Sequence, residues 1–491
     1  MIRPLKTLWF FLVVGMALGL MSIVLPPEGI QVAGFTIHLP TLESYLVKDT
    51  TSYADITDLI KNSEDIDSLP DITKVVPQEK LTIHGIERID PKDTLKAKAG
   101  ELAKSIYRIK FPKGGRKELL NFFKKLKTKN SVRVMHYGDS QLEGDRITNY
   151  IRNKLQKKYG GSGPGLIPAL QPYDSYASIS QSNEGNWLRF PIFGKVNPQV
   201  QHNKYGPLAA FSRFAPLMPD SLYTDSIIYH AAITIKESKV SYNSVRNFQK
   251  IAVFYGNARR PVEIKIEEKG KLVTSDTLLV NTDFSVFQYV LAEPTKEVRI
   301  EFAGADSPDI YGISLEADSG VSVDNIALRG SSGTFFRKID YAQLQRAYNV
   351  LDVDLFIMQF GGNVMPYVKD SADVIRYGKW FYSQLATVRK MHPQAAMIVI
   401  GPSDMSYKQG GKYVSYPLLP LVRNELQKAA FRAGCGYWDM YEAMGGYNSM
   451  PSWVRAKPSL AGADYTHFTP RGAKLIANMF YNALMVESIK K

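Results

Sequence analysis

Two kinds of strand pattern, in separate parts of the chain, constrain the fold most. Short runs rich in apolar residues occur on both sides of a long middle region, and stretches with helical spacing lie between them. Such runs are typical of parallel strands, which are covered on both faces of their sheet. They are Ser131–Tyr137 on the N-terminal side, and Val321–Leu328, Val353–Phe360, Ala396–Ile400 and the region 431–440 on the C-terminal side. The alternation predicts an α/β domain with a parallel sheet.

The middle region, residues 173–320, shows a different pattern. Its short strand-like runs follow one another without intervening helices, and turn residues separate them: Ile251–Tyr255, Val262–Ile266, Lys271–Thr274, Val298–Phe302 and Ile310–Leu315. Many short strands of this kind indicate a β-sandwich. We therefore predict one discontinuous α/β domain, residues 101–172 and 321–491, split by an inserted β-sandwich at 173–320.

The N-terminus carries a long uncharged run. Arg3 and Lys6 precede the eighteen residues Leu8–Leu25, and Pro26-Pro27 end them. At a rise of about 1.5 Å per residue such a helix is just long enough to cross a bilayer core. We predict a transmembrane signal anchor at 1–27 and a membrane-proximal stalk at 28–100. A cleaved signal peptide is the alternative, although no clean cleavage site is present.

Both alternatives export the rest of the chain, because the positive charges stay on the inner side. The expected location is the cell envelope. An anchored protein would hold its catalytic domain in the periplasm at the inner membrane, and a cleaved one would be secreted.

Composition limits the chemistry that the chain can use. The single cysteine, Cys435, excludes an internal disulfide framework, a four-cysteine zinc site and a CxxC redox pair. No H-E-x-x-H motif is present, and we expect neither a metal nor an organic cofactor. The 61 Lys and Arg outnumber the 47 Asp and Glu, but they are scattered. Without a recognised binding motif, an exported domain of this kind is not expected to bind nucleic acid.

A serine follows the first apolar strand. In Gly138-Asp139-Ser140 the strand gives way to a tight turn, and Asp145 is a plausible N-cap for the helix after it. Open α/β sheets place their sites at this carboxyl edge. The backbone N–H of a serine there can also face a developing oxyanion. The helix has an apolar face at every fourth residue, namely Ile147, Ile151 and Leu155.

A serine nucleophile needs a base and an orienting acid. Of the seven histidines only His467 has an aspartate three residues earlier, Asp464, which lets the carboxylate reach the imidazole. Thr469-Pro470 then supplies the cap and first turn of a last helix. His136 is a rival base, but it lies within a strand and is expected to pack there. No G-x-S-x-G motif surrounds Ser140 or Ser403, which disfavours an α/β-hydrolase.

Two further turns could provide oxyanion donors. Gly330 follows the run Val321–Leu328, and Asn363 follows Gly361-Gly362 after the run that ends at Phe360. With Ser140 and the Asp464–His467 pair, they make four polar turns in chain order.

These four turns resemble the blocks of the SGNH (GDSL-like) hydrolases. The matching stretches are GDSQLEGD with Ser140, DNIALRG with Gly330, GGN with Asn363, and DYTH with Asp464 and His467. The resemblance implies a three-layer, flavodoxin-like domain with the catalytic residues Ser140, Asp464 and His467. It also implies an oxyanion hole made by Ser140, Gly330 and Asn363. Gly333 lies close to Gly330, and Val364 stands where many members have Asp.

Within that family, the chain looks like the peptidoglycan O-acetylesterase group. The resemblance lies in GDSQLEGDRIT, in the YGGSGPG loop and in the β-rich insert, which is similar to a carbohydrate-binding module. The loop is expected to be mobile and to lie beside the site. Aromatic residues of the insert are candidates for stacking on sugars: Trp187, Tyr205, Tyr223, Tyr229, Tyr242 and Tyr255.

The function that this resemblance implies is a serine esterase of the cell envelope. It would hydrolyse O-acetyl esters on peptidoglycan or another polysaccharide through an acyl-enzyme on Ser140, with the membrane as a further partner. Two alternatives stay open at this point: a polysaccharide O-acetyltransferase with the same triad, and a glycan-binding envelope protein without catalysis.

Overall fold

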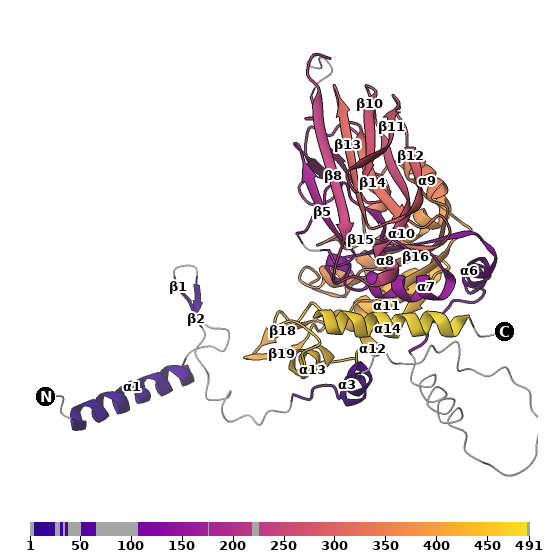
Figure 1. Cartoon of the computed structure of the whole chain (residues 1–491). Coiled ribbons are helices and arrows are strands. Elements are labelled where there is room, and N and C mark those ends of the chain that lie inside the picture. The colour runs from indigo at the N-terminus through magenta and orange to yellow at the C-terminus, as the bar shows by residue number, and fades with distance from the viewer. Residues whose placement is uncertain are drawn as a thin grey trace, which may run out of the picture.

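A sheet of five parallel strands organises the half of the chain that carries the predicted site (Figure 1). The computed structural model describes residues 4–24, 30–32, 35–37, 51–64, 107–174, 176–218 and 225–488. In spatial order the strands are β15 (Gly320–Ala327), β3 (Ser131–Gly138), β16 (Val353–Gln359), β17 (Ala396–Ile400) and β20 (Gly436–Trp438). Taken in chain order this is the 2-1-3-4-5 arrangement of flavodoxin-like sheets. The predicted parallel sheet is therefore present.

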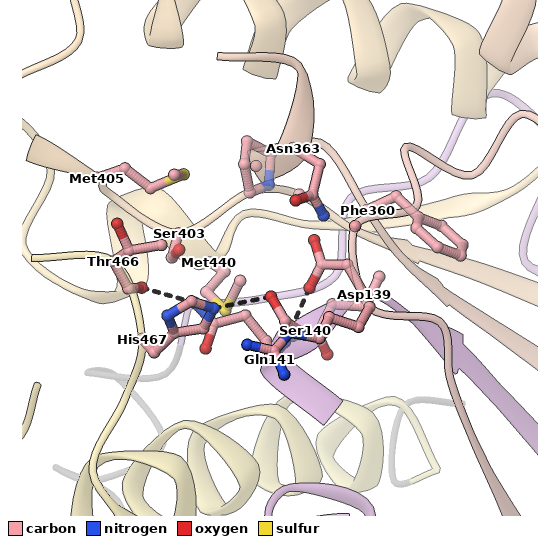
Figure 2. Close-up of a pocket in the computed structure, with 16 residues that line it drawn as sticks. Asp139, Ser140, Gln141, Phe360, Asn363, Ser403, Met405, Met440, Thr466 and His467 are labelled. Atoms are coloured by element: carbon pink, nitrogen blue, oxygen red, sulfur yellow. Dashed lines mark hydrogen bonds between the residues drawn. The ribbon is translucent and has the colours of Figure 1, made fainter. Parts of the chain in front are cut away.

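The order of strands places a site between β3 and β16. In sheets of this type the strand order reverses between the first and third strands, and ligands bind at the carboxyl ends there. Ser140 follows β3 and Asn363 follows β16, and both residues line one cavity (Figure 2).

Helices cover both faces of the parallel sheet. Side chains alternate along β3, so that Val134 enters the core on one face and Met135 enters the core on the other. One face is covered by α6 (Lys117–Thr128), α7 (Thr148–Tyr159) and α14 (Pro470–Glu487), and the other by α9 (Tyr341–Leu351), α10 (Ser371–Met391) and α11 (Leu419–Arg432). Each fully buried Leu, Ile or Phe contributes about 1.5–3 kcal/mol. The result is a three-layer domain.

The middle of the chain forms two antiparallel sheets that face each other. One contains β11 (Lys271–Leu278), β10 (Val262–Glu268), β13 (Glu297–Gly304), β8 (Tyr229–Glu237) and β5 (Ile179–Glu184). The other contains β12 (Ser285–Thr295), β9 (Phe248–Gly256), β14 (Asp309–Glu316), β7 (Ala210–Arg213), β6 (Leu188–Pro191) and β4 (Gly165–Ile167). Ile233, Ile264 and Ile313 belong to the core between the sheets. Figure 1 shows these strands extending away from the helices of the three-layer domain.

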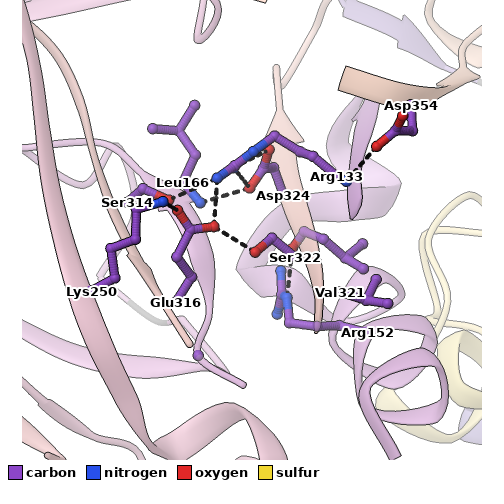
Figure 3. Close-up of polar contacts among 12 residues, drawn as sticks. Arg133, Arg152, Leu166, Lys250, Ser314, Glu316, Val321, Ser322, Asp324 and Asp354 are labelled. Atoms are coloured by element: carbon purple, nitrogen blue, oxygen red, sulfur yellow. Dashed lines mark hydrogen bonds and ion pairs between the residues drawn. The ribbon is translucent and has the colours of Figure 1, made fainter. Parts of the chain in front are cut away.

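A buried ionic network joins the sandwich to the parallel sheet (Figure 3). Arg133 on β3 donates to both carboxylate oxygens of Asp324 on β15, at 2.8 and 2.9 Å, and to Glu316 on β14 at 2.5 Å. Asp324 also accepts the backbone N–H of Leu166 on β4 at 2.8 Å. Burial acts to lower the pKa of Arg133, but the two carboxylates outweigh it and raise that pKa. Because removing one partner would leave a buried charge unpaired, the network holds the two parts in one orientation.

The glycine-rich stretch 159–165 lies at this junction and not beside the site. A Cβ on Gly163 would lie 2.3 Å from the carbonyl oxygen of Leu315, and one on Gly165 would lie 2.5 Å from Asp324 Oδ1. Only glycine permits so close an approach of two backbones. None of these glycines lines the cavity that contains Ser140. The prediction of a loop beside the site is therefore wrong.

The predicted transmembrane helix needs a correction. The segment does form a helix, α1 (Pro4–Val24). Crossing a bilayer takes about 20 consecutive, mostly apolar residues. Within the described ranges, no helix has both the length and the apolar character that a membrane span requires. The prediction of a transmembrane helix is wrong on this finding, and the membrane as a partner gains no support from it.

Part of the predicted stalk packs on the three-layer domain. Ile56 is 5% exposed and belongs to the core on one face of the parallel sheet. The side chain of Asn448 donates to the carbonyl of Ser52 at 3.0 Å. Residues 65–100 lie outside the described residues, and the domain boundaries stay predictions. The remaining elements are β1 (Ile30–Val32), β2 (Phe35–Ile37), α3 (Thr57–Glu64), α8 (Asn243–Arg246), η3 (Phe336–Lys338), β18 (Ser406–Gln409), β19 (Lys412–Ser415), α12 (Met440–Ala443) and α13 (Ser449–Arg455).

Candidate active site

Ser140, His467 and Asp464 form a continuous hydrogen-bonded chain. Ser140 begins the 3-10 turn η1 (Ser140–Asp145) directly after β3, and its Oγ lies 2.8 Å from Nε2 of His467. Nδ1 of the same imidazole lies 2.7 Å from Oδ2 of Asp464. The structure therefore brings Ser140 to a histidine and an aspartate that lie more than 300 positions later in the sequence. The catalytic roles assigned to them stay predictions.

Asp464 is held as a carboxylate that orients the imidazole. Its Oδ1 accepts the backbone N–H groups of Thr466 and His467, each at 3.1 Å, while Oδ2 faces the ring. Partial burial acts to raise the pKa of Asp464, but the ring and the two N–H groups outweigh it and hold the pKa below its usual value. An anion at Nδ1 keeps the proton there, which leaves the lone pair of Nε2 directed at Ser140.

The start of α14 positions this loop. Thr469 accepts a hydrogen bond from the N–H of Gly472 at 3.2 Å, and Pro470 occupies the first turn of the helix. The predicted cap is confirmed. A capping hydroxyl satisfies one of the unpaired donors of a helix N-terminus and typically contributes about 1 kcal/mol.

Gly330 and Asn363 both line the cavity next to Ser140. Gly330 lies in the turn that the hydrogen bond from Ser331 N to Leu328 O closes at 2.9 Å, and its φ of +79° favours glycine. Asn363 lies in the 3-10 turn η4 (Gly362–Val364), and its Nδ2 donates to the Ser331 carbonyl at 3.1 Å. A side-chain amide has two N–H bonds, so the second can donate a hydrogen bond inside the cavity. Figure 2 shows this amide and the His467 imidazole on different sides of the Ser140 hydroxyl.

Gly333, the neighbouring candidate, has a different environment. A Cβ there would lie 2.7 Å from the ring of Phe360 and 3.0 Å from that of Phe381. Gly333 thus serves packing, whereas Gly330 has open space around it and lines the cavity.

The cavity is small and mostly apolar. Its volume is about 210 Å³, below the about 300–1,000 Å³ of sites for drug-sized ligands. Apolar walls come from Phe360, Pro402, Met405 and Met440. A space of this size suits a short acyl group.

Gln141, which the sequence analysis did not single out, connects the two halves of the site. Its Nε2 donates to the carbonyl of Thr466 at 2.7 Å, and its Oε1 accepts the N–H of Phe468 at 3.4 Å. The side chain is 6% exposed. Only its position next to Ser140 could have drawn attention to it, because its partners are more than 300 residues away.

Asp139, also missed, is a buried acid beside the nucleophile. Its Oδ1 accepts the backbone N–H of Gln141 at 2.9 Å and so caps η1. Burial raises the pKa of Asp139 to about 6, although that hydrogen bond and the charge of His467 act against the rise.

Asp145 does not cap α7 as predicted. It lies inside η1 with a φ of +61°, and its carboxylate accepts a hydrogen bond from the buried Arg152 at 2.6 Å. The hydroxyl of Ser178 donates to the same carboxylate. The residue therefore braces the turn after Ser140 through an ion pair.

His136 is not a second base. Its ring is buried between Gln359, at 3.1 Å from Nε2, and Thr148, at 2.9 Å from Nδ1. Burial lowers the pKa of His136 to about 3, so the ring is neutral. It packs within the strand, as the sequence indicated.

The aromatic residues proposed to stack on sugars are mostly covered. Trp187, Tyr205 and Tyr255 are each less than 10% exposed. Tyr223 lies outside the described residues. Tyr229 and Tyr242 are half-buried. Sugar binding by the insert stays a prediction.

In the part of the chain that the structure describes, no cluster of three or more His, Cys, Asp or Glu is placed to hold a metal ion.

Comparisons with known proteins bear on the fold. No protein-family model matches the chain, and no curated protein matches it. A solved structure described as a peptidoglycan O-acetylesterase superposes with a TM-score of 0.57 at 18% identity, over 75% of this chain and 95% of the other. The chain has an SGNH hydrolase fold.

Two other structures overlap with this SGNH fold more loosely. One is a family two carbohydrate esterase from Clostridium thermocellum in complex with cellohexaose, at 10% identity and a TM-score of 0.23, over 52% of this chain and 90% of that one. The other is a salicylyl-acyltransferase from a tetracycline biosynthetic pathway, at 12% identity and a TM-score of 0.27, over 64% and 98%. Because both TM-scores are so low, neither structure adds support for the fold of this chain.

Proposed function

We propose that this protein is a serine esterase that removes acetyl groups from peptidoglycan or another polysaccharide. The observation that carries the proposal is the 2.8 Å contact between Ser140 Oγ and His467 Nε2, on an imidazole whose other nitrogen faces the Asp464 carboxylate at 2.7 Å. Nucleophile, base and orienting acid in this order are the requirement for acyl transfer through serine.

The mechanism has two acyl transfers. His467 takes the proton of Ser140 as Oγ attacks the ester carbonyl, and the backbone N–H groups of Ser140 and Gly330 with the Asn363 amide hold the oxyanion. The intermediate then expels the sugar oxygen, which receives the proton from His467, and the acyl group stays on Ser140. Water attacks this ester while His467 accepts a proton from it, and His467 then gives that proton to the departing Ser140 Oγ as the carboxylic acid leaves. Each oxyanion donor contributes about 10²–10³ in turnover.

Solvent access favours water as the acceptor. The side chain of Asp464 is 52% exposed and that of His467 is 34% exposed, so water can reach the imidazole that would activate it. A transferase must instead keep water from its acyl-enzyme. The cavity of about 210 Å³ supports a short acyl group such as acetyl.

The polysaccharide substrate rests on two supports. One is the resemblance of the four sequence blocks to the O-acetylesterase group, and the other is the fold shared with a structure described as a peptidoglycan O-acetylesterase. Action outside the cytoplasm is part of this proposal, since such a substrate lies there.

Acetate release tests the proposal. The purified chain is incubated with O-acetylated peptidoglycan and, separately, with an aryl acetate, and free acetate is measured. We expect release in both cases, and loss of release in Ser140→Ala and His467→Ala. Acetylated glycan formed from an aryl acetate donor and a glycan acceptor, without free acetate, would identify a transferase. No turnover of either substrate by the unmodified chain would favour a glycan-binding protein.

A further inference from the structure

Tyr465 lies inside the turn that carries Asp464 and His467, and its backbone is strained. Its φ is +54°, in the left-handed region that a bulky aromatic residue rarely occupies. Strain of this kind persists only where the surrounding contacts enforce it. The conformation bears on the site, because it sets the path of the chain between a carboxylate and an imidazole that lie 2.7 Å apart.

Two contacts from a neighbouring hairpin hold Tyr465. Strands β18 and β19 form this hairpin and lie beside α13 (Figure 1). The ring of Tyr413 on β19 stacks on the ring of Tyr465, with centroids 3.5 Å apart and planes within 5° of parallel. The backbone N–H of Ser406 on β18 donates to the Tyr465 carbonyl at 3.1 Å. One strand thus holds the side chain of Tyr465, and the other strand holds its backbone.

Buried hydrogen bonds fix the base of the hairpin. Asp404 accepts the hydroxyl of Ser415 at 2.6 Å and the backbone N–H of Met450 at 2.7 Å. The same hydroxyl oxygen accepts the N–H of Asn448 at 2.8 Å, and Oδ1 of Asn448 accepts the N–H of Ser415 at 2.9 Å. All three polar side chains are buried. A buried network whose members are satisfied is rigid, so the hairpin can impose a position on the turn that it contacts.

The hairpin reaches the site through Tyr465. Neither Tyr413 nor Tyr465 lines the cavity that contains Ser140, whereas Thr466 and His467 both do. The stacked rings therefore lie behind the residues that face the cavity. Their contact bears on where the imidazole lies and not on the surface that a substrate meets.

We propose that Tyr413 is a positioning residue for the reaction. Its stack on Tyr465 holds the turn that directs the His467 imidazole at Ser140. The inference rests on the proposed function, because the position of the imidazole matters through acyl transfer at Ser140. Without the ring of Tyr413, Tyr465 can relax out of the left-handed region and shift the imidazole. A displacement of about 1 Å can lower a rate by about 10²-fold.

The test measures kcat and KM of the full chain on an aryl acetate. We expect kcat to fall about 10- to 100-fold in Tyr413→Ala with little change in KM, because the imidazole is displaced while the cavity wall is intact. Tyr413→Phe retains the stacked ring and should keep kcat within about threefold. Labelling of Ser140 by an aryl phosphonate should slow in parallel, since it needs the same imidazole.

Tyr407→Ala is the matched control. Tyr407 is a half-buried tyrosine on the same hairpin, as Tyr413 is. It pairs with Val414, the neighbour of Tyr413, and therefore points from the opposite face of the two strands. Its ring lies 5.0 Å from that of Tyr416, between centroids. Tyr407→Ala should weaken the hairpin and leave kcat within about threefold.

A double-mutant cycle separates positioning from a general loss of stability. Tyr465→Asn removes the partner ring and tolerates the left-handed backbone. Adding Tyr413→Ala to Tyr465→Asn should then change kcat by less than about twofold, because the stack is already absent. Should Tyr413→Ala fail to fold, Tyr465→Asn removes the same stack from its other side and should show the same fall in kcat.

An unchanged kcat in Tyr413→Ala, an equal fall in Tyr407→Ala, or additive losses in the double variant would overturn the positioning role. So would a rise in KM for an acetylated glycan without a fall in kcat, which would show that Tyr413 contacts the substrate. No turnover of an aryl acetate by the unmodified chain would refute the esterase, and the labelling rates of Ser140 would then decide on Tyr413 alone. An unmodified chain that is not labelled either would overturn both.

Discussion

The side-chain amide of Gln141 donates a hydrogen bond to the carbonyl of Thr466 at 2.7 Å. It thereby joins the residue after the proposed nucleophile to the residue before the proposed base. The Ser140–His467 contact depends on two loops from opposite ends of a discontinuous domain, and this amide helps to set the distance between them.

Replacing Gln141 by Met keeps the length of the side chain and removes the amide. We expect kcat to fall about 10- to 100-fold with little change in KM, because the loop that carries His467 loses a hydrogen bond that positions it. Gln181→Met is the matched control, since Nε2 of Gln181 donates to the Ala169 carbonyl, also at 2.7 Å, in the sandwich. Both variants should lose about 1–3 kcal/mol of stability in urea unfolding. An unchanged kcat in Gln141→Met would remove its positioning role.

Gly330→Ala tests the oxyanion turn. A Cβ at Gly330 meets nothing within 4 Å, but its φ of +79° strains any other residue by about 1–2 kcal/mol. Gly114 has a φ of +78° and equally open space, so Gly114→Ala carries the same strain away from the site. We expect similar losses of thermal stability in both. Only in Gly330→Ala should kcat drop, by about tenfold or more, because the strained φ displaces the backbone N–H that would hold the oxyanion. Equal activities in the two variants would contradict a role of Gly330 in oxyanion binding.

Asp464→Asn tests the orienting acid. The amide can no longer hold a proton firmly at Nδ1 of His467, so the fraction of imidazole in the productive tautomer falls. We expect kcat to decrease by about 10²–10⁴, measured with an aryl acetate at neutral pH. The fold should be retained, because the side chain is 52% exposed. Full activity of Asp464→Asn would show that another group orients the ring.

The buried acid Asp139 predicts a dependence of stability on pH. Burial raises its pKa from 3.8 to about 6, so the folded state binds the proton more tightly than the unfolded state does. Its contribution to the free energy of unfolding is therefore most favourable below about pH 4 and is lost as pH rises through about 6. The whole effect amounts to as much as about 3 kcal/mol.

Urea unfolding of the unmodified chain and of Asp139→Asn measures this contribution. The asparagine does not titrate but can still accept the Gln141 N–H. The difference in stability should move in favour of the unmodified chain as pH falls from about 7 to about 4. A difference that stays constant over this range would show that Asp139 does not titrate there.

The sequence identified those parts of the site that depend on local pattern. Apolar runs located the strands of the parallel sheet and, in the sandwich, β9, β10, β11, β13 and β14. The aspartate three residues before His467 distinguished it from the other histidines. Ser140 followed from the turn after the first strand. Each of these sequence patterns lies within a few residues of the structural feature that it predicts.

Contacts between distant segments were not accessible in the same way. Gln141 acquires its partners only when the turn after β3 meets the loop that carries Thr466 and Phe468. Asp145 was misassigned because its left-handed backbone and its pair with Arg152 depend on the folded turn. The glycine-rich stretch was misplaced because a close approach of two backbones leaves no mark in a single sequence.

The acyl-enzyme is the central claim, and covalent capture of Ser140 measures it most directly. The chain is treated with a serine-directed aryl phosphonate, digested and analysed by mass spectrometry, beside Ser140→Ala and His467→Ala. We expect one modified peptide, containing Ser140, whose labelling is slow without His467 and absent without the serine hydroxyl. A label on another residue, or an unmodified Ser140 in a chain that still releases acetate, would contradict it.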